Sequence, residues 1–142
     1  MPYRYLDDIA TADVAFEATG TTVEEMIVAA ADAAMNVMVH DLEDIRPQVE
    51  IPLDIRNSEI DLLLFDLLQE LVFYKDAREL LLRVTEPVLT QGEEFCLKCV
   101  CRGEKIDPAR HKLIVDVKAV TLHLFTVEKT AEGWKAHVIL DI

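Results

Sequence analysis

Apolar residues recur at helical spacing in a first stretch near the N-terminus. They stand three or four positions apart at Val23, Ile27, Ala30, Ala34 and Met38. Such spacing places side chains on one face of an α-helix. Thr21 and Glu24, next to this stripe, have the three-residue spacing of a capping box. The pattern predicts a helix that begins at about Thr21 and ends near His40.

A second stretch has apolar residues on nearly every helical face. They are Ile60, Leu63, Leu64, Leu67, Leu68, Leu71 and Val72. Ser58 precedes this stretch and is suited to be its N-cap, with Asp61 three residues later as the matching acid. A helix with so little polar surface is typically buried, so we expect this helix to be central and to pack against sheet.

The other patterned segments indicate β-strands. We predict strands over 49–55, 80–86, 93–103, 112–120, 121–129 and 134–142, with a hairpin turn at 129–133. Apolar and polar residues alternate over 49–55, and Pro52 favours a place at the sheet edge. The order of elements predicts an α+β fold: two main helices packed on a mainly antiparallel sheet, with a strand-rich C-terminal half. Because no linker or repeat divides the chain, we expect residues 1–142 to form a single domain.

The chain is strongly acidic. It has 27 Asp and Glu residues against 14 Lys and Arg, and a formal net charge of −13. Nucleic-acid binding depends on Lys and Arg side chains that neutralise phosphates, so we expect no direct nucleic-acid binding and instead a protein or a metal ion as the partner. There is neither an uncharged apolar run of about 20 residues for a membrane span nor an N-terminal signal-peptide pattern. We therefore expect no membrane association and a cytoplasmic location.

The residue types that often carry chemistry do not form a familiar catalytic pattern. Cys96, Cys99 and Cys101 lie close together, but strand alternation puts Cys96 on the opposite face from the other two. We therefore favour reduced thiols in the core over a zinc site. The sequence has no H-E-x-x-H, P-loop or nucleophile-elbow motif. The acidic stretch at 40–44 is interpreted as a solvated loop.

Three carboxylates near the two ends of the sequence offer a candidate metal site. Asp13 precedes the apolar run 14–16, and Asp141 stands next to Ile142, whose main-chain carboxylate is expected to be free. If the strands that carry them are neighbours, these groups converge and need either protons or a hard cation such as Ca²⁺, Mg²⁺ or Mn²⁺. The residues alone leave open the simpler alternative, an exposed Asp near the chain end.

Several segments resemble the archease family. They are T-A-D-V at 11–14, L-L-Q-E-L at 67–71, R-H-K at 110–112, V-K-A-V-T-L-H at 117–123, G-W at 133–134 and I-L-D-I at 139–142. The resemblance therefore spans nearly the whole chain, with motifs at both ends and in the same order. Two positions depart from the family pattern, because Ala10 stands where archeases usually have His and Leu122 where they usually have Tyr.

The resemblance implies a function for the candidate metal site. Archeases bind a divalent metal ion through the residues that match Asp13, Asp141 and Ile142, with Ca²⁺, Mg²⁺ or Mn²⁺ as the expected ion here. They are accessory proteins of RtcB-type RNA ligases, and they promote guanylylation of the ligase's active-site histidine and its multiple turnover in tRNA splicing. The chain is therefore expected to be an activator of the ligase and not itself an enzyme.

Other functions stay open at this point. One is a stand-alone metal-dependent hydrolase of a small phosphorylated substrate, which would use the same carboxylates to activate water. Another is a general protein chaperone that binds through its acidic surface. Lys118 is a weaker candidate for contact with a ligase, and its simpler interpretation is a solvent-facing strand residue.

Overall fold

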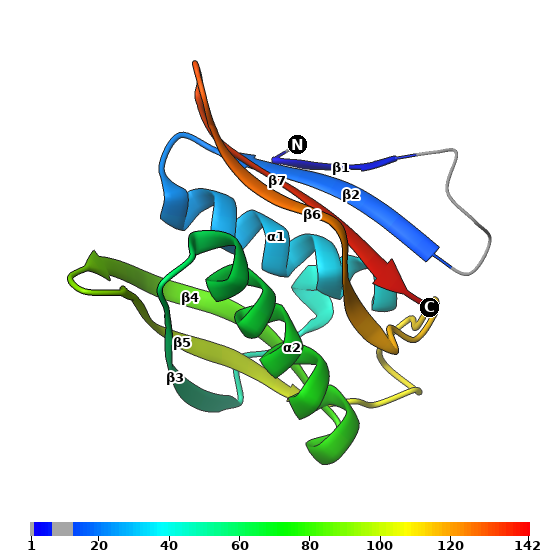
Figure 1. Ribbon diagram of the computed structural model, residues 1–142. Helices are drawn as coiled ribbons and strands as arrows, with labels where there is room; N and C mark the ends of the chain where they lie inside the picture. The colour runs from blue at the N-terminus through cyan, green and yellow to red at the C-terminus, as the bar shows by residue number, and fades with distance from the viewer. Residues whose placement is uncertain (1, 7–12) are drawn as a thin grey trace.

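The computed structural model describes residues 2–6 and 13–142, and in it both helices lie between two antiparallel sheets (Figure 1). One sheet has the order β1-β2-β7-β6, formed by β1 (Tyr3–Leu6), β2 (Asp13–Gly20), β7 (Gly133–Asp141) and β6 (Ala119–Thr130). The other has the order β3-β5-β4, formed by β3 (Val49–Asn57), β5 (Phe95–Lys105) and β4 (Leu80–Gln91). The helices are α1 (Val23–Met38), the short 3₁₀ helix η1 (Leu42–Asp44) and α2 (Ile60–Arg78). The α+β prediction is confirmed, with two sheets in place of one.

Helix α1 is buried on two sides because it contacts β2 and β7 of one sheet and β4 of the other. Its buried face is rich in small residues: Ala29, Ala30, Ala31, Ala33 and Ala34. Methyl side chains let the helix backbone come close to both sheets. The predicted apolar stripe is therefore real, and the second sheet explains why the buried surface of this helix is wider than one stripe.

The predicted N-caps of both helices are wrong. Helix α1 is capped by Thr22, whose hydroxyl accepts a hydrogen bond from the Glu25 amide (3.1 Å), while the Glu25 carboxylate accepts one from the Thr21 amide (2.9 Å). The capping box therefore lies one residue later than the Thr21–Glu24 spacing predicted. Ser58 does not cap α2, because the N-cap position is Glu59, without a side-chain hydrogen bond.

Helix α2 is central, as its apolar composition predicted. It contacts β6 of one sheet and β3, β4 and β5 of the other, and its leucines at 63, 64, 67, 68 and 71 are buried. Lys75 is also buried, and its ammonium donates to the Val117 carbonyl (2.7 Å) and lies 2.5 Å from the carboxylates of Asp76 and Asp116. Burial alone would lower the pKa of Lys75, but the two carboxylates outweigh it and raise that pKa above its ordinary value. Through its contacts with Val117 and Asp116, Lys75 holds the segment before β6 against α2.

The small sheet agrees with the predicted alternation. β3 is an edge strand, as Pro52 indicated, and its residues alternate between half-buried and exposed positions. On the central strand β5, Cys99 and Cys101 are buried in the core, whereas Cys96 lies on the other face with its thiol 3.4 Å from the Asp54 carboxylate. The prediction of core thiols is confirmed for Cys99 and Cys101 and wrong for Cys96, which is only half-buried.

The predicted strand at 112–120 is wrong for most of its length. Only a single bridge, Leu113 with Val39, forms before β6 begins at Ala119. The segment runs past the C-terminal end of α1, where the amides of His40 and Ile114 donate to the carbonyls of Lys112 and Met38 (both 2.9 Å). Its β-branched residues favour an extended backbone, but no neighbouring strand is available to continue a ladder.

No helix in the described part of the chain is long and apolar enough to cross a membrane.

We predict that Gly103→Ala destabilises the protein strongly. Gly103 lies on β5 between two neighbouring strands, and a Cβ atom there would come within 1.7 Å of the Leu81 carbonyl oxygen, a backbone atom that cannot move alone. Overpacking of this kind costs about 3 kcal/mol or more of unfolding free energy. The matched control is Gly92→Ala, where a Cβ meets nothing within 4 Å. Urea unfolding of the two variants checks this, and equal stabilities would contradict it.

Candidate metal-binding site at the ends of β2 and β7

The site is built by the pairing of β2 with β7. The two strands are antiparallel, and their register places Asp13, the first residue of β2, directly opposite Asp141, the last residue of β7. Residues directly opposite each other in an antiparallel pair share one face of the sheet, with Cβ atoms about 4.5–5.5 Å apart. The pairing of these two strands therefore brings the two predicted carboxylates together, as we expected for neighbouring strands.

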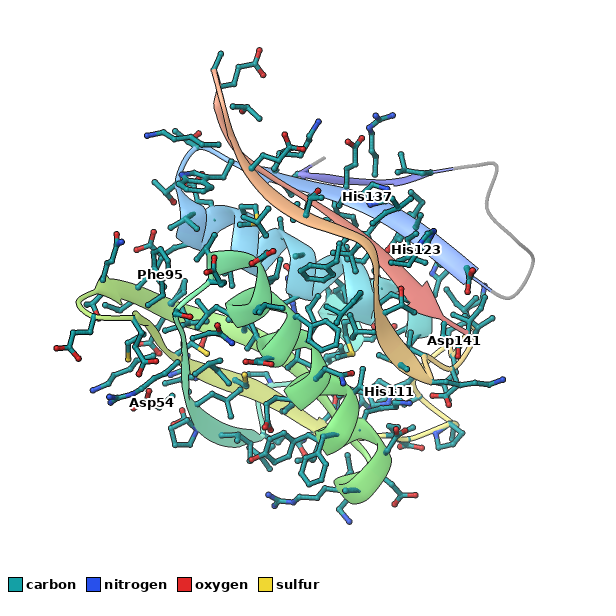
Figure 2. All side chains as sticks on the ribbon, viewed as in Figure 1. Asp54, Phe95, His111, His123, His137 and Asp141 are labelled. Carbon is teal, nitrogen blue, oxygen red and sulfur yellow. The ribbon has the colours of Figure 1, made fainter. Side chains whose placement is uncertain are left out.

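Both aspartates are half-buried, and Ile142 follows Asp141 with its side chain packed against the hydrophobic core. Figure 2 shows Asp141 at the end of β7, beyond His137 on the same sheet. Within residues 2–6 and 13–142, neither Asp13 nor Asp141 has a basic side chain within 4.0 Å. The two carboxylates therefore lie on one face of the sheet without a basic partner among the described residues.

The donor set of the site suits a hard cation. In the described part of the chain, no three side chains of His, Cys, Asp or Glu gather closely enough to hold a metal ion. A metal between Asp13 and Asp141 therefore needs further oxygen ligands, such as a main-chain oxygen of Ile142 or water. Ca²⁺, Mg²⁺ and Mn²⁺ accept such all-oxygen sets.

The surroundings of Asp141 combine backbone contacts with exposed side chains. The Lys118 amide donates to the Asp141 carbonyl oxygen (2.8 Å), and Ala119 pairs with Asp141 from the β6 side. Lys118 is exposed, as predicted, but it lies one residue before β6 and not within a strand. The remaining residues of the T-A-D-V segment, Thr11 and Ala12, and the departing position Ala10 lie outside the described residues.

The second departure from the family pattern, Leu122, lies in an irregular part of β6. The register against β7 shifts between Thr121 and Thr126, and Leu124 has a left-handed backbone (φ 53°). The carbonyl oxygen of Leu124 accepts a hydrogen bond from Nδ1 of His137 (2.8 Å). Leu122 and Leu124 are consequently turned outward, each with more than half of its surface exposed.

The acidic stretch at 40–44 has a structural role. The Asp41 carboxylate accepts from the Glu43 amide (3.0 Å) at the start of η1, and the Asp44 carbonyl accepts from Arg110 (2.7 Å). These contacts agree with the interpretation of a surface loop.

A buried ionic cluster beside this loop was missed by the sequence reasoning. Glu104 forms an ion pair with Arg110 and accepts hydrogen bonds from His111 and from the Arg46 amide (2.7 Å). Nδ1 of His111 accepts from the Asp107 amide (2.9 Å), so Nε2 carries the proton that is shared with Glu104 (3.0 Å). Burial alone would raise the pKa of Glu104, but these donors outweigh it and lower that pKa to about 2. The cluster joins β5 to the segment before β3 and to the loop that follows β5.

The fold and site define a small α+β protein with paired carboxylates at the joined ends of two strands. The model of the Archease protein family matches residues 3–142, and the chain belongs to this family. The protein archease of Methanosarcina mazei is 36% identical over 142 residues, covering 99% of this chain and 95% of that protein. The protein archease of Methanopyrus kandleri is 32% identical and covers both chains fully.

Two solved structures share the fold. The solution structure of Methanobacterium thermoautotrophicum protein 1598 matches with a TM-score of 0.84 and 29% identity over 99% of each chain. The crystal structure of an archease from Thermotoga maritima, described as a possible chaperone, has a TM-score of 0.59 at 22% identity, covering 94% of this chain and 93% of that one. At that identity the second similarity concerns the fold alone.

We predict that Glu104→Gln flattens the acid dependence of stability. The folded pKa of Glu104, about 2, lies below its ordinary value of 4.5. Its charge therefore stabilises the fold above about pH 4.5, and that contribution is lost as the pH falls toward 2. We expect the variant to be about 2 kcal/mol less stable at pH 7, with the difference shrinking between pH 5 and pH 2.5. Urea unfolding at a series of pH values measures it, with the exposed Glu93→Gln as control. A difference that does not change with pH would contradict the prediction.

Proposed function

We propose that this protein is a metal-binding accessory protein of an RtcB-type RNA ligase, which promotes guanylylation of the ligase and its multiple turnover in tRNA splicing. The observation that carries the proposal is the direct pairing of Asp13 with Asp141 across β2 and β7. Membership of the archease family supports it, because the resemblance of the T-A-D-V and I-L-D-I segments to archeases implies a divalent metal ion at these positions. The protein has no catalytic role of its own in this proposal.

In this proposal Asp13, Asp141 and the main-chain carboxylate of Ile142 hold one divalent cation, Ca²⁺, Mg²⁺ or Mn²⁺. Three carboxylate groups fill only part of the coordination sphere of such an ion, which takes six or more oxygen ligands. The remaining positions are open to water or to a group of the ligase. The role of this chain is then to hold the cation at the surface, where it can stabilise negative charge in the ligase's nucleotide site.

Exposed apolar side chains that precede and follow Lys118 in the sequence support a protein as the partner, since Lys118 contacts Asp141 through its backbone amide. Leu113, Ile114 and Val115 precede the backbone contact of Lys118 with Asp141, and Leu122 and Leu124 follow it. All five have at least 40% of their surface exposed. Apolar surface around a charged site is typical of protein–protein contact. The net charge of −13 disfavours direct contact with RNA, so the ligase and not the tRNA is the proposed partner.

We expect Asp13→Asn and Asp141→Asn each to weaken Mn²⁺ binding at least tenfold and to abolish stimulation of the ligase. Each change removes one of two charged ligands and keeps the shape of the side chain. Electron paramagnetic resonance measures Mn²⁺ binding, and multiple-turnover RNA ligation with substoichiometric amounts of this protein measures stimulation. A variant with two residues added after Ile142 should fail in the same way, because its carboxylate is moved.

The control is Asp54→Asn, which removes an exposed carboxylate from β3 in the other sheet. It should bind Mn²⁺ and stimulate ligation normally. If the Asp13→Asn and Asp141→Asn variants still stimulated ligation, the metal site would have no part in the mechanism. Turnover of a phosphorylated substrate by the protein alone would favour the hydrolase alternative. Protection of unrelated proteins from aggregation, unchanged in the variants, would favour a general chaperone.

A second variant separates docking from metal binding. We expect Ile114→Ser combined with Leu122→Ser to bind Mn²⁺ normally but to require at least tenfold more protein for half-maximal stimulation of ligation, because two exposed apolar contacts are lost. Val88→Ser is the control, since Val88 is equally exposed (56%) but lies on β4 of the other sheet. Equal effects of the two changes would place the docking surface elsewhere.

A further inference from the structure

A groove lies at the end of β7 that is opposite to Asp141. It has a volume of about 990 Å³ and lies between the first half of α1, the turn that precedes α1, the β6–β7 hairpin and Pro87 of β4. Trp134 in the groove and Asp141 are seven positions apart on β7, which corresponds to about 24 Å along an extended strand. The groove is therefore a surface separate from the candidate metal site.

The groove has an apolar floor. Val28 and Ala29 of α1 line it together with Pro87 and the half-buried indole of Trp134. Trp134 is the single tryptophan of the chain. A half-buried indole beside aliphatic side chains favours ligands that combine an apolar stem with a cationic head.

The rim of the groove is acidic. Its carboxylates are Glu24, Glu25, Asp32 and Glu132, and Lys135 is the basic side chain among its lining residues. Asp32 is paired with Arg83 (3.1 Å), and the Glu25 carboxylate accepts from the Thr21 amide (2.9 Å). Lys135 lies 3.5 Å from the Glu17 carboxylate, so its charge already has a partner. Glu132 lies in the β6–β7 turn and Glu24 in the first turn of α1, and in the part of the chain that the structure describes neither forms an ion pair.

A second hollow shows that this imbalance is not general. It has about 730 Å³ and lies at the β4–β5 turn, and its lining holds Glu93 and Glu94 together with Arg56 and Lys98, of which Arg56 is paired with Asp54 (3.2 Å). The net charge of the protein therefore does not make every concave surface acidic, and the groove beside Trp134 differs in both its charge and its aromatic side chain.

We propose that the groove binds a basic segment of a partner protein, with an arginine or lysine stem against Trp134 and its cationic head between Glu24 and Glu132. The apolar floor covers the stem, the indole face attracts the cation, and the acidic rim complements the charge. The same rim repels phosphates, so a nucleic acid does not fit. This docking site is independent of the metal site and goes beyond the proposed function.

The fluorescence of Trp134 tests the proposal in the full chain. The probe is an acetylated and amidated tetra-arginine peptide, and a tetra-glutamine peptide of the same form is the neutral control. We expect a saturable change in fluorescence with one tetra-arginine peptide per chain, which weakens as salt is raised, and no change with tetra-glutamine. No saturable change with tetra-arginine would overturn the proposal.

Matched variants separate a specific groove from general attraction to an acidic protein. Glu24→Gln combined with Glu132→Gln should raise the dissociation constant at least tenfold. Glu93→Gln combined with Glu94→Gln removes the same charge at the β4–β5 turn and should change it less than twofold. Asp13→Asn should bind the peptide normally, so that failure of the metal site and failure of the groove are distinguishable. Equal weakening by the two double variants would overturn the proposal.

Amide chemical shifts supply a second readout that does not depend on fluorescence. On addition of tetra-arginine, the shifts that move should be those of Val28, Ala29 and the Trp134 indole. Shifts confined to residues outside the groove would contradict the assignment even if fluorescence changed.

Discussion

The pairing of β2 with β7 is the constraint on which the rest of the structure depends. On the inner face its register sets Phe16 against Val138 and Ala18 against Ala136, all of them buried in the core between the sheets. On the outer face the same register sets Asp13 against Asp141. Because side chains alternate along a strand, a slip of one residue would turn Phe16 outward and move Asp13 out of register with Asp141. The core and the candidate site are therefore fixed by one register, and the hydrophobic burial that stabilises the fold also holds the two carboxylates together.

Placing both helices between two sheets imposes a second condition, which is that polar groups inside must find partners. Because α2 contacts both sheets, it can be apolar on most of its faces, although Leu62 and Phe73 remain exposed. The charged side chains that are buried have partners. Lys75 contacts a carbonyl and two carboxylates. Glu104 contacts a backbone amide, Arg110 and His111. Among the described residues, no buried side-chain nitrogen or oxygen lacks a hydrogen-bond partner. These polar contacts fasten the long connection before β6, which has almost no strand pairing of its own, to the helices and to β5.

The parts of this fold that could be predicted from sequence are those set by local periodicity. Several features follow from spacing along the chain: the stripe of α1, the leucines of α2, the edge position of Pro52 and the opposed faces of Cys96 and Cys99.

The predictions that failed depend on contacts with residues that are distant in the sequence. The segment at 112–120 is β-prone, but whether it joins a sheet depends on which strand is beside it. Thr21 and Thr22 are both able to cap a helix, and tertiary contacts decide between them. Glu104 gives no local signal, whereas Lys75, four residues after Leu71 and in phase with the apolar positions of α2, could have been suspected of being buried. The candidate metal site could be predicted only in part. The sequence suggested that carboxylates near its two ends lie close together, but only the β2–β7 register shows that Asp13 and Asp141 are paired.

The acidity of the chain has different consequences at the two ends of β7. At the Asp141 end, the two aspartates face each other without a basic neighbour among the described residues, so a small divalent cation can satisfy both at short range. At the Trp134 end, the carboxylates are spread around an apolar floor, so they suit a larger organic cation whose stem needs apolar contact. The field of a protein with a net charge of −13 attracts cations to both places and repels phosphates from both. For the proposed function, this charge favours contact with a protein partner over direct contact with RNA.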